Sequence, residues 1–319
     1  MKETLEKLLA GPVSGEALAH ELGITRSAVH KRIEALRAAG VEIDALAGRG
    51  YRLRRPIELF DRDAILATLS PSARAELAEL HLAFETDSTQ SRALAAAAPT
   101  KGCALWLAER QTAGQGRRGR AWASPLAAHV CLSVARRFDL GFALLSGLSL
   151  AVGVLVAEAL QAAGFDDVRL KWPNDLVVGG RKLGGILIQL RGEAMGPCEA
   201  VIGLGLNVRM PSSSGELIDQ PWCDLAGLTK DEVSRQRVLV AVLDRLLPGL
   251  AVYEREGFPA FLRRWQALDS LHGHRVRVID GRDSVEGLAL GIAEDGALRV
   301  QLPEGEGRYH GGEVSVRSE

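Results

Sequence analysis

The chain has 319 residues, of which 47% are hydrophobic, and its 39 Lys and Arg residues nearly balance its 40 Asp and Glu residues. This composition is that of a soluble globular protein of about two or three domains. Along the chain we find no internal repeat and no low-complexity tract. Residues 1–55 carry 10 basic and 7 acidic side chains, while the remainder carries 29 and 33. A slightly basic N-terminal segment fits a small nucleic-acid-binding domain on a slightly acidic body.

Other bulk features indicate a cytoplasmic protein. The N-terminus mixes charges with leucines, so we expect no signal peptide. The four cysteines form no Cys-x-x-Cys pair, and we interpret them as reduced core thiols that bind no zinc. An uncharged run over residues 140–157 contains three glycines and two serines, which favours a buried core helix over a membrane span. We therefore expect no contact with a membrane.

The N-terminal segment predicts three short helices. The first covers residues 3–10, Ser14 caps a second to residue 22, and Thr25 caps a third to about residue 39. In the third helix Val29, Ile33 and Leu36 fall at helical spacing, so they form one core-facing stripe.

A hairpin follows, with strands over residues 41–45 and 51–53 around the turn Gly48-Arg49-Gly50. Helix, glycine turn, helix and hairpin are the pattern of a winged helix-turn-helix domain, which we place at residues 1–55. Such a domain inserts the start of its last helix into the major groove, and a hairpin arginine reaches phosphate. A three-helix protein-interaction module would have the same core. The predicted DNA-binding residues are Thr25, Arg26, Ser27, His30, Lys31 and Arg49.

A linker at residues 54–56 precedes alternating strand and helix patterns, which predict a central α/β domain over residues 61–270. We expect helices over 61–69, from 70, and over 90–98, 143–163, 231–254 and 258–267, and strands over 80–85, 103–109, 130–135, 168–171, 176–178, 183–190 and 199–205. Short β runs at 275–280, 284–292, 298–302 and 313–316 then predict a small barrel over residues 271–319.

The loop QTAGQGRRGR, residues 111–120, follows the strand over 103–109 and carries three glycines and three arginines. Glycine lets a backbone approach a ligand closely, and arginine offers permanent charge with a planar set of donors. The glycines match the dinucleotide-binding spacing, but no helix follows the last one, because residues 121–124 run into Pro125 and then a strand. We therefore interpret the loop as a segment that encloses a small anionic ligand.

Further polar residues can converge on this loop, although each also has a plain structural interpretation as a cap, a solvated hairpin or a core residue. They contribute cations, hydroxyls and amides, with no Ser/His/Asp or Cys/His set and no metal-binding cluster. Such a site suits a reaction between anions, in which positioning and charge stabilisation lower the barrier. Transfer of a nucleotidyl group to a carboxylate is one example. The residues are Ser88, Thr89, Gln111, Trp122, Lys171, Asn174, Asp175, Lys182 and Asn207.

Several segments together resemble the bifunctional bacterial biotin–protein ligases that also repress the biotin operon. They are SGEALAHELGITRSAVHKRIEALRAAGV, GRGYRL, DST, QTAGQGRRGR, KWPNDL, KLGGIL, GLGLNV and GGEVSVR, in this order. The resemblance covers nearly the whole chain. It implies an α+β multidomain fold with an N-terminal winged helix-turn-helix, a central α/β ligase domain on a mixed sheet, and a C-terminal SH3-like β-barrel.

The resemblance implies that biotin and MgATP form biotinyl-adenylate and pyrophosphate, and that a lysine of the biotin carboxyl carrier protein of acetyl-CoA carboxylase then attacks the mixed anhydride. Biotin, ATP and Mg²⁺ are thus the implied ligands. The implied catalytic residues are Lys182, Arg117 and Lys171. The implied biotin-binding residues are Ser88, Thr89, Gln90, Gln111, Gln115, Gly116, Arg117, Lys182 and Gly185. The implied ATP and adenylate residues are Arg118, Arg120, Trp122, Asn174, Asp175, Asn207 and Arg317.

One position departs from the family pattern. The family loop often reads GRGRRG, whereas this chain has Gln115 in place of the first arginine. The substitution removes one cation, so retention of an anionic ligand depends more on Arg117, Arg118 and Arg120.

The resemblance also implies regulation, in which bound adenylate orders the loops, favours a homodimer and lets two winged helices reach two half-sites of operator DNA. Two other function classes stay open. A ligand-sensing repressor without ligase activity would need the same helix-turn-helix and pocket, but not both Lys171 and Lys182 beside a nucleotide site. A lipoate ligase of related fold would share the lysines, but is not expected to carry this loop or the N-terminal domain.

Overall fold

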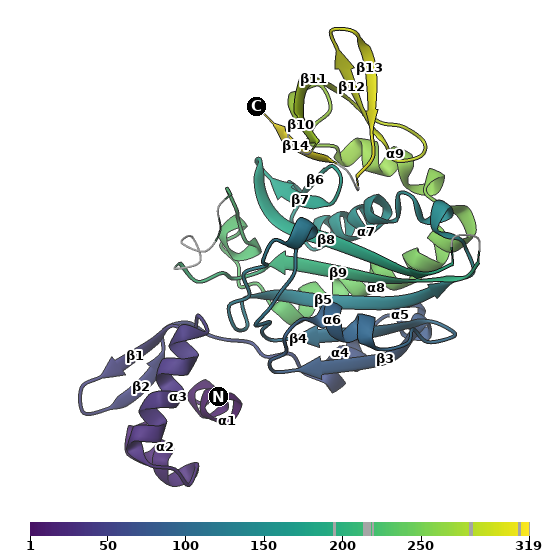
Figure 1. Ribbon diagram of the computed structural model, residues 1–319. Helices are drawn as coiled ribbons and strands as arrows, with labels where there is room; N and C mark the ends of the chain where they lie inside the picture. Colours follow the sequence, from purple (N-terminus) through teal and green to yellow (C-terminus); the bar gives the residue numbers. More distant parts are fainter. Residues whose placement is uncertain (194–195, 213–217, 219, 281–282, 312–313, 319) are drawn as a thin grey trace.

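The computed structural model describes residues 1–193, 196–212, 218, 220–280, 283–311 and 314–318. Figure 1 shows a small helical N-terminal part, a large central sheet flanked by helices, and a β-rich C-terminal part at the opposite end of the molecule. The site of interest lies in the central part, so the other two are described briefly.

The N-terminal part has the predicted order of elements. It contains α1 (Lys2–Leu9), α2 (Gly15–Glu21), α3 (Arg26–Ala38) and the antiparallel pair β1 (Ile43–Leu46) and β2 (Gly50–Leu53). Ser14 and Thr25 cap their helices as predicted, because their hydroxyl oxygens accept from the N–H groups of Ala17 and Ala28. The predicted stripe of Val29, Ile33 and Leu36 is buried and packs in one core with side chains of α1 and α2.

The central part is built on a seven-stranded mixed sheet of order β3-β4-β5-β9-β8-β7-β6. The edge strand β3 runs parallel to β4, and every other neighbouring pair is antiparallel. The predicted mixed sheet is therefore confirmed. The strands are β3 (Leu77–Ala83), β4 (Cys103–Ala108), β5 (His129–Phe138), β6 (Arg169–Lys171), β7 (Asp175–Val178), β8 (Arg181–Gly192) and β9 (Cys198–Asn207).

Helices cover the two faces of this sheet unequally. Alternate residues of the strands, such as Leu105 and Val134, pack in the main core with α7 (Leu148–Ala162) and α8 (Arg235–Glu256). The residues between them, such as Trp106 and Ala135, face the short helix α6 (Thr89–Ala95). The face under α6 thus stays thinly covered. The remaining helices are α4 (Arg62–Thr68), α5 (Pro71–Glu76) and α9 (Pro259–Leu268).

The long uncharged run forms a core helix, as predicted. Phe142–Ala162 is long and apolar enough to span a membrane by length and composition, but most of it is buried inside the protein. The predicted single helix over 143–163 is wrong at its start, since Phe142–Leu145 forms a 3-10 turn and α7 begins only at Leu148. Gly147 separates the two with φ +84°, and a Cβ there would lie 2.7 Å from Phe258.

The C-terminal part is an antiparallel sheet of order β13-β12-β11-β10-β14. Its strands are β10 (Arg275–Asp280), β11 (Asp283–Ile292), β12 (Leu298–Leu302), β13 (Gly305–Tyr309) and β14 (Val314–Ser318). The sequence patterns predicted four of them and missed β13, because Gly, Glu and Arg residues dominate that strand. All four cysteines are free and buried, in agreement with their interpretation as core thiols.

Candidate active site

The start of α6 is joined to the glycine-rich loop by buried hydrogen bonds. The Ser88 hydroxyl caps α6 by accepting from the Ser91 N–H. Thr89 donates from its backbone N–H and from its Oγ1 to Gln111 Oε1, at 2.8 and 3.1 Å. Ser88, Thr89 and Gln90 are all less than 5% exposed. The first turn of α6 and the beginning of the loop are therefore one rigid unit.

A row of hydrogen bonds fixes this unit to the sheet beneath it. Ser133 on β5 contributes a buried hydroxyl that lies 2.9 Å from Thr89 Oγ1 and 3.1 Å from Gln90 Oε1. Gln90 Nε2 in turn donates to Gln189 Oε1 on β8 and to the Val201 carbonyl oxygen on β9. Three central strands thus hold α6: β5 and β8 through the side chains of Ser133 and Gln189, and β9 through a backbone carbonyl oxygen.

Glycines on this face leave the sheet open to close approach. Gly203 and Gly205 lie two residues apart on β9 and therefore share one face of the sheet. Gly205 pairs with Gly185 of β8. A Cβ at Gly205 would lie 2.6 Å from the Trp122 ring, and a Cβ at Gly203 would lie 2.6 Å from Gln90 Oε1. A side chain at Gly205 would therefore collide with the Trp122 ring, and one at Gly203 would displace the Gln90 amide. The bare backbone forms a floor on which Trp122 rests and a flat ligand can lie.

One cation points across this floor. Lys182 Nζ lies 2.7 Å from Asp175 Oδ1 and 5.9 Å from the centre of the Trp122 ring. Its side chain is 19% exposed, so its charge acts in a partly dehydrated place. A Cβ at Gly185 would lie 3.4 Å from Nζ, which shows how closely the lysine follows the floor.

The second half of the loop folds toward the same place. Gly116 N–H donates to the Arg120 carbonyl oxygen, and Arg118 adopts a left-handed conformation with φ 57°. Arg117 Nη1 donates to Asn174 Oδ1 at 3.0 Å, and Nη2 donates to the Gly311 carbonyl oxygen. Burial and the neighbouring Arg118 lower the pKa of the Arg117 guanidinium. A bound anion would stabilise the positive charge of the Arg117 guanidinium in this environment.

Contacts therefore connect many of the residues that the sequence singled out. They run from α6 through the loop and Trp122 to β7 and β8. The connected residues are Ser88, Thr89, Gln90, Gln111, Gly116, Arg117, Trp122, Asn174, Asp175, Lys182 and Gly185. Their roles toward a ligand stay predictions.

Other predicted site residues lie differently. Asn207 is buried, and its Nδ2 donates to the Cys223 carbonyl oxygen, so one hydrogen bond of this amide is made within the fold. Gln115 Nε2 lies 3.4 Å from Ser91 Oγ at an exposed position. Lys171 pairs in register with Asp175 between β6 and β7. Among the remaining predicted residues, Arg118 and Arg120 are exposed in the loop, and the Arg317 side chain lies outside the described residues.

Sequence reasoning missed several residues that shape this site. Ser133 carried no motif, yet it joins α6 to β5. Gly203 and Gly205 could have been recognised, because two glycines spaced by two in a strand leave one face bare. Ser124 and Cys131 contact Gln111 from below. Among the described residues, no three His, Cys, Asp or Glu side chains are placed to hold a metal ion.

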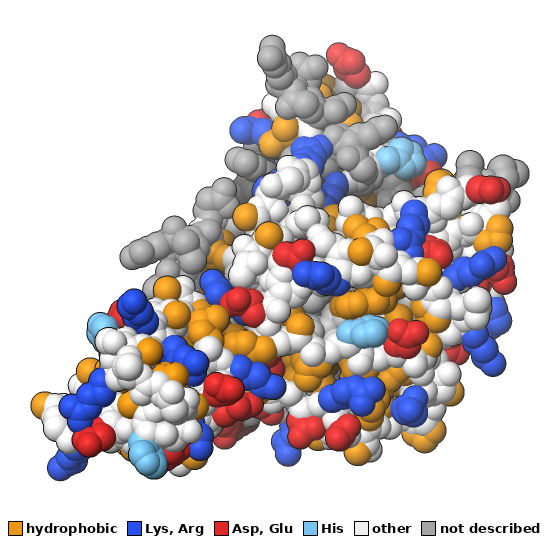
Figure 2. Space-filling model, turned by 60° about the horizontal axis from the view of Figure 1, so that its bottom comes forward, with side chains coloured by type: hydrophobic (Ala, Val, Ile, Leu, Met, Phe, Trp, Pro, Cys, Tyr) orange, Lys and Arg blue, Asp and Glu red, His pale blue; other side chains and the backbone are white. Residues whose placement is uncertain are grey.

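A groove of about 890 Å³ is lined mainly by residues of α6, β3 and β4. His81 on β3 and Trp106 on β4 stack in it, with ring centres 5.0 Å apart, and Arg92 of α6 also lines it. Figure 2 looks onto this side, where hydrophobic side chains lie exposed between charged ones. Thr89 also lines this groove. Because Thr89 donates hydrogen bonds to Gln111, the groove adjoins the candidate site.

The predicted DNA-binding residues lie at the start of α3 and on the hairpin turn. Thr25 and Ser27 hydroxyls lie 3.0 Å apart, and Arg26 forms an exposed ion pair with Glu16. In the space-filling view the N-terminal part carries many basic side chains among fewer acidic ones (Figure 2). The further predicted residues His30, Lys31 and Arg49 are exposed.

Comparison with known proteins relates this geometry to a family. Residues 85–207 match the biotin/lipoate A/B protein ligase family, residues 3–52 match a helix-turn-helix domain, and residues 271–317 match the biotin protein ligase C-terminal domain. The bifunctional ligase/repressor BirA of Salmonella typhimurium is 38% identical over 96% of this chain and 93% of its own length. The chain belongs to the bifunctional biotin ligase/repressor family.

Other biotin ligases match a smaller share of the chain. The biotin–[acetyl-CoA-carboxylase] ligase of Mycobacterium tuberculosis is 34% identical over 70% of this chain and 84% of its own length. The structure of the biotin protein ligase of Aquifex aeolicus in complex with biotin and ATP superimposes with a TM-score of 0.64 at 28% identity, and covers 76% of this chain and 99% of the Aquifex chain. Over about three quarters of its length, this family member thus shares the fold of a ligase that holds both substrates.

Proposed function

We propose that this protein is an ATP-dependent biotin–protein ligase that also represses transcription of biotin synthesis genes. The observation that carries the proposal is the 38% identity to a bifunctional ligase/repressor over nearly the whole length of both chains. The reaction joins the carboxylate of biotin to the α-phosphorus of ATP with loss of pyrophosphate. A lysine amine of the biotin carboxyl carrier protein of acetyl-CoA carboxylase then attacks the acyl carbon, and AMP leaves.

We assign the biotin head group to the unit formed by Ser88, Thr89 and Gln111, with Gln90, Gln115, Gly116 and Gly185 around it. Three observations support this place. The hydroxyl and amide groups there are buried and rigidly held, the sheet beside them carries no side chains at its glycines, and the loop lies directly above. Polar groups on an otherwise apolar floor suit a small ligand with a polar ring and an apolar tail.

The first chemical step brings two anions together, so its main barrier is their repulsion. We assign Lys182 to the biotin carboxylate and the α-phosphate, because its Nζ already pairs with the Asp175 carboxylate at 2.7 Å and lies beside the floor. Arg117 and Lys171 add further positive charge. Together with Lys182 they stabilise negative charge that grows on the phosphate oxygens as the pyrophosphate leaves.

The nucleotide is assigned to the Trp122 side of the floor. Trp122 offers a flat ring, and its buried Nε1 lacks a hydrogen-bond partner among the described residues. Mg²⁺ enters with ATP as part of the substrate. We also assign the loop cations and nearby polar residues to this side. They are Arg118, Arg120, Asn174, Asp175, Asn207 and Arg317.

An assay with purified protein tests the ligase activity. The protein is incubated with MgATP, an acceptor domain, and either biotin or lipoate, and the mass of the acceptor is measured. We expect the mass shift of one biotinyl group and none with lipoate. No shift with either ligand would leave a ligand-sensing repressor, and a shift with lipoate alone would indicate a lipoate ligase.

We further propose that the adenylate-bound form is a cytoplasmic homodimer without membrane contact, that binds operator DNA. Its winged helix-turn-helix domains would contact the two half-sites through Thr25, Arg26, Ser27, His30, Lys31 and Arg49. The exposure of these side chains supports the assignment. We also propose that the C-terminal sheet closes into an SH3-like barrel. Footprinting of the promoter region with and without biotin and ATP tests repression. DNA protection that is the same with and without the two ligands would contradict it.

A further inference from the structure

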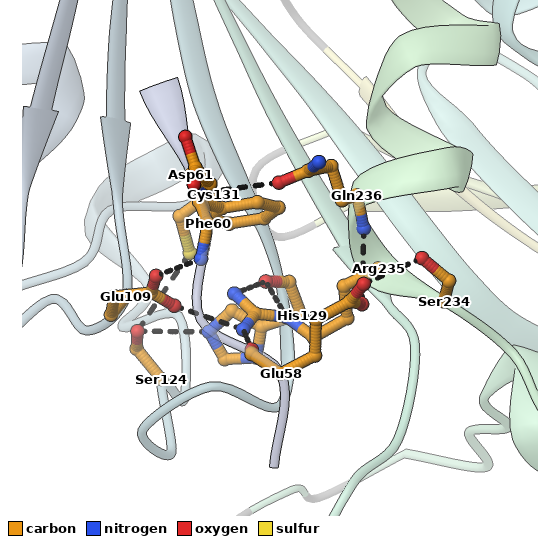
Figure 3. A network of polar contacts seen from close by, with 10 residues as sticks. All are labelled: Glu58, Phe60, Asp61, Glu109, Ser124, His129, Cys131, Ser234, Arg235 and Gln236. Carbon is orange, nitrogen blue, oxygen red and sulfur yellow. Dashed lines mark hydrogen bonds and ion pairs between the residues drawn. The ribbon is translucent and has the colours of Figure 1, made fainter. Parts of the chain in front are cut away.

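A group of polar side chains, half-buried at Ser124 and buried elsewhere, contacts the beginning of the glycine-rich loop, and the proposed reaction gives it no role. They come from the end of β4, the start of β5, the start of α8 and the segment after the loop, and Figure 3 shows them converging on one place. The group consists of Ser124, His129 and Cys131 together with the ion pair Glu109–Arg235.

Ser124 connects this group to Gln111. Its Oγ accepts a hydrogen bond from the Gln111 backbone N–H at 2.8 Å, and it lies 2.8 Å from His129 Nε2. The Gln111 side chain is held separately, because its Nε2 donates to Cys131 Sγ at 3.2 Å and its Oε1 accepts from Thr89. Both the backbone and the side chain of Gln111 are thus fixed from below.

The direction of the contact between His129 and Ser124 follows from the surroundings of the imidazole. His129 is fully buried, and its Nδ1 has no hydrogen-bond partner among the described residues. A buried N–H without an acceptor costs more than a bare lone pair, so the proton belongs on Nε2 and points at Ser124 Oγ. Burial and the nearby Arg235 lower the pKa of His129 to about 3, so the ring is neutral at physiological pH.

The Ser124 oxygen consequently accepts two hydrogen bonds, one from Gln111 and one from His129. Its own hydrogen is left for Cys131 Sγ, which lies 3.7 Å away. Both lone pairs and the hydrogen of this hydroxyl are then engaged, so the group cannot rotate freely. Its oxygen therefore accepts from the Gln111 N–H at a fixed position. Arg235 holds the histidine in turn, since its Nη2 donates to the His129 carbonyl oxygen at 3.0 Å.

We propose that Ser124, oriented by neutral His129, is a positioning residue that holds Gln111 in the conformation that receives biotin. The inference rests on the proposed function, because it takes Gln111 as a biotin-binding residue. In the part of the chain that the structure describes, Ser124 forms hydrogen bonds with Gln111, His129 and Cys131, and none with Lys182 or Arg117. Loss of its hydroxyl therefore weakens binding of biotin and leaves the chemical step at its normal rate.

The kinetic test compares three variants of the full-length protein, Ser124→Ala, Ser124→Thr and Ser70→Ala. Ser70 Oγ caps α5 by accepting from the Ala73 N–H at 3.3 Å, so S70A removes a comparable hydrogen bond far from the site. For S124A we expect the KM for biotin to rise roughly five- to tenfold with kcat retained, the effect of one lost hydrogen bond. S124T keeps a hydroxyl and S70A leaves the site intact, so both should retain the wild-type KM.

Several results would overturn the proposal. An unchanged KM in S124A would do so, as would an increase of equal size in S70A, or a loss confined to kcat. If the wild-type protein biotinylates no acceptor, the proposed function itself has failed, and the positioning role is then judged from the second measurement alone.

That measurement is ¹⁵N spectroscopy of protein labelled at histidine, with His129 assigned through His129→Gln. We expect a proton on Nε2 that does not titrate between about pH 5 and 8, whereas an unperturbed histidine titrates in that range. Addition of biotin should shift this signal in wild-type protein and not in S124A. A proton on Nδ1, a titrating ring, or a signal insensitive to biotin would contradict the proposal.

Discussion

The buried ion pair between Glu109 and Arg235 makes a quantitative prediction about stability. The two side chains are 4% and 3% exposed, and Arg235 Nη1 lies 2.9 Å from Glu109 Oε2. Arg235 also donates to the carbonyl oxygens of Glu58 and His129, and its guanidinium lies 4.1 Å from the centre of the Phe60 ring. Arg235→Met retains much of the volume but leaves the Glu109 carboxylate with the Phe60 N–H as its partner. Removal of one member of such a pair costs about 3–5 kcal/mol.

A double-mutant cycle in urea separates the lone charge from the lost packing. Wild type, R235M, Glu109→Met and the double variant are unfolded at neutral pH, and tryptophan fluorescence follows the transition. R235M should lose about 3–5 kcal/mol of the free energy of unfolding, and the double variant should lose less, because no charge is then buried alone. A loss below about 1 kcal/mol in R235M, or single losses that simply add, would refute the reasoning.

Four further outcomes follow from the site. Arg117→Gly should still form adenylate but release it faster, since the loop loses a half-buried cation; unchanged retention of labelled intermediate would contradict this. Lys182→Ala should abolish biotin-dependent pyrophosphate exchange, because the carboxylate loses its counter-charge, and near-normal exchange would refute that role. Gly205→Ala places a methyl group 2.6 Å from the Trp122 ring, so the KM for ATP should rise at a stability cost of about 1–3 kcal/mol, as kinetics and urea titration can measure. His129 has a folded pKa of about 3 against 6.5 when unfolded, so the unfolded state takes up the proton first and stability falls as the pH drops through that window. The loss is roughly 1.4 kcal/mol at about pH 5.5, and His129→Gln should flatten this part of the urea–pH profile.

The N-terminal domain was the most predictable part of the chain. Its caps, its glycine turns and the stripe of Val29, Ile33 and Leu36 all depend on neighbours within a few residues in sequence. Such local signals can be recognised without knowledge of the tertiary structure, because helix capping and helical periodicity depend on the segment itself. The hairpin around Gly48 followed for the same reason.

Predictions failed where a distant residue decides the local structure. The uncharged run reads as one helix, but Phe258 packs against Gly147, more than a hundred residues away, and α7 begins only after that glycine. Strand β13 contains Gly, Glu and Arg residues and forms because β12 offers it an antiparallel edge. Neither feature leaves a signal in its own segment, since the deciding contact comes from elsewhere in the fold.

The sequence by itself predicted an anionic ligand for the loop at residues 111–120 and identified the family to which its motifs belong. The charge of its arginines and the backbone freedom of its glycines are properties of the residues themselves, so they can be recognised without knowing which residues they contact. Only the tertiary structure decided how the loop is held. Ser124 and His129 gain their meaning from Gln111 and from Arg235, and Arg235 stands 106 residues beyond His129. A hydrogen-bond direction depends on which atoms meet in space, and the order of residues along the chain does not contain that information.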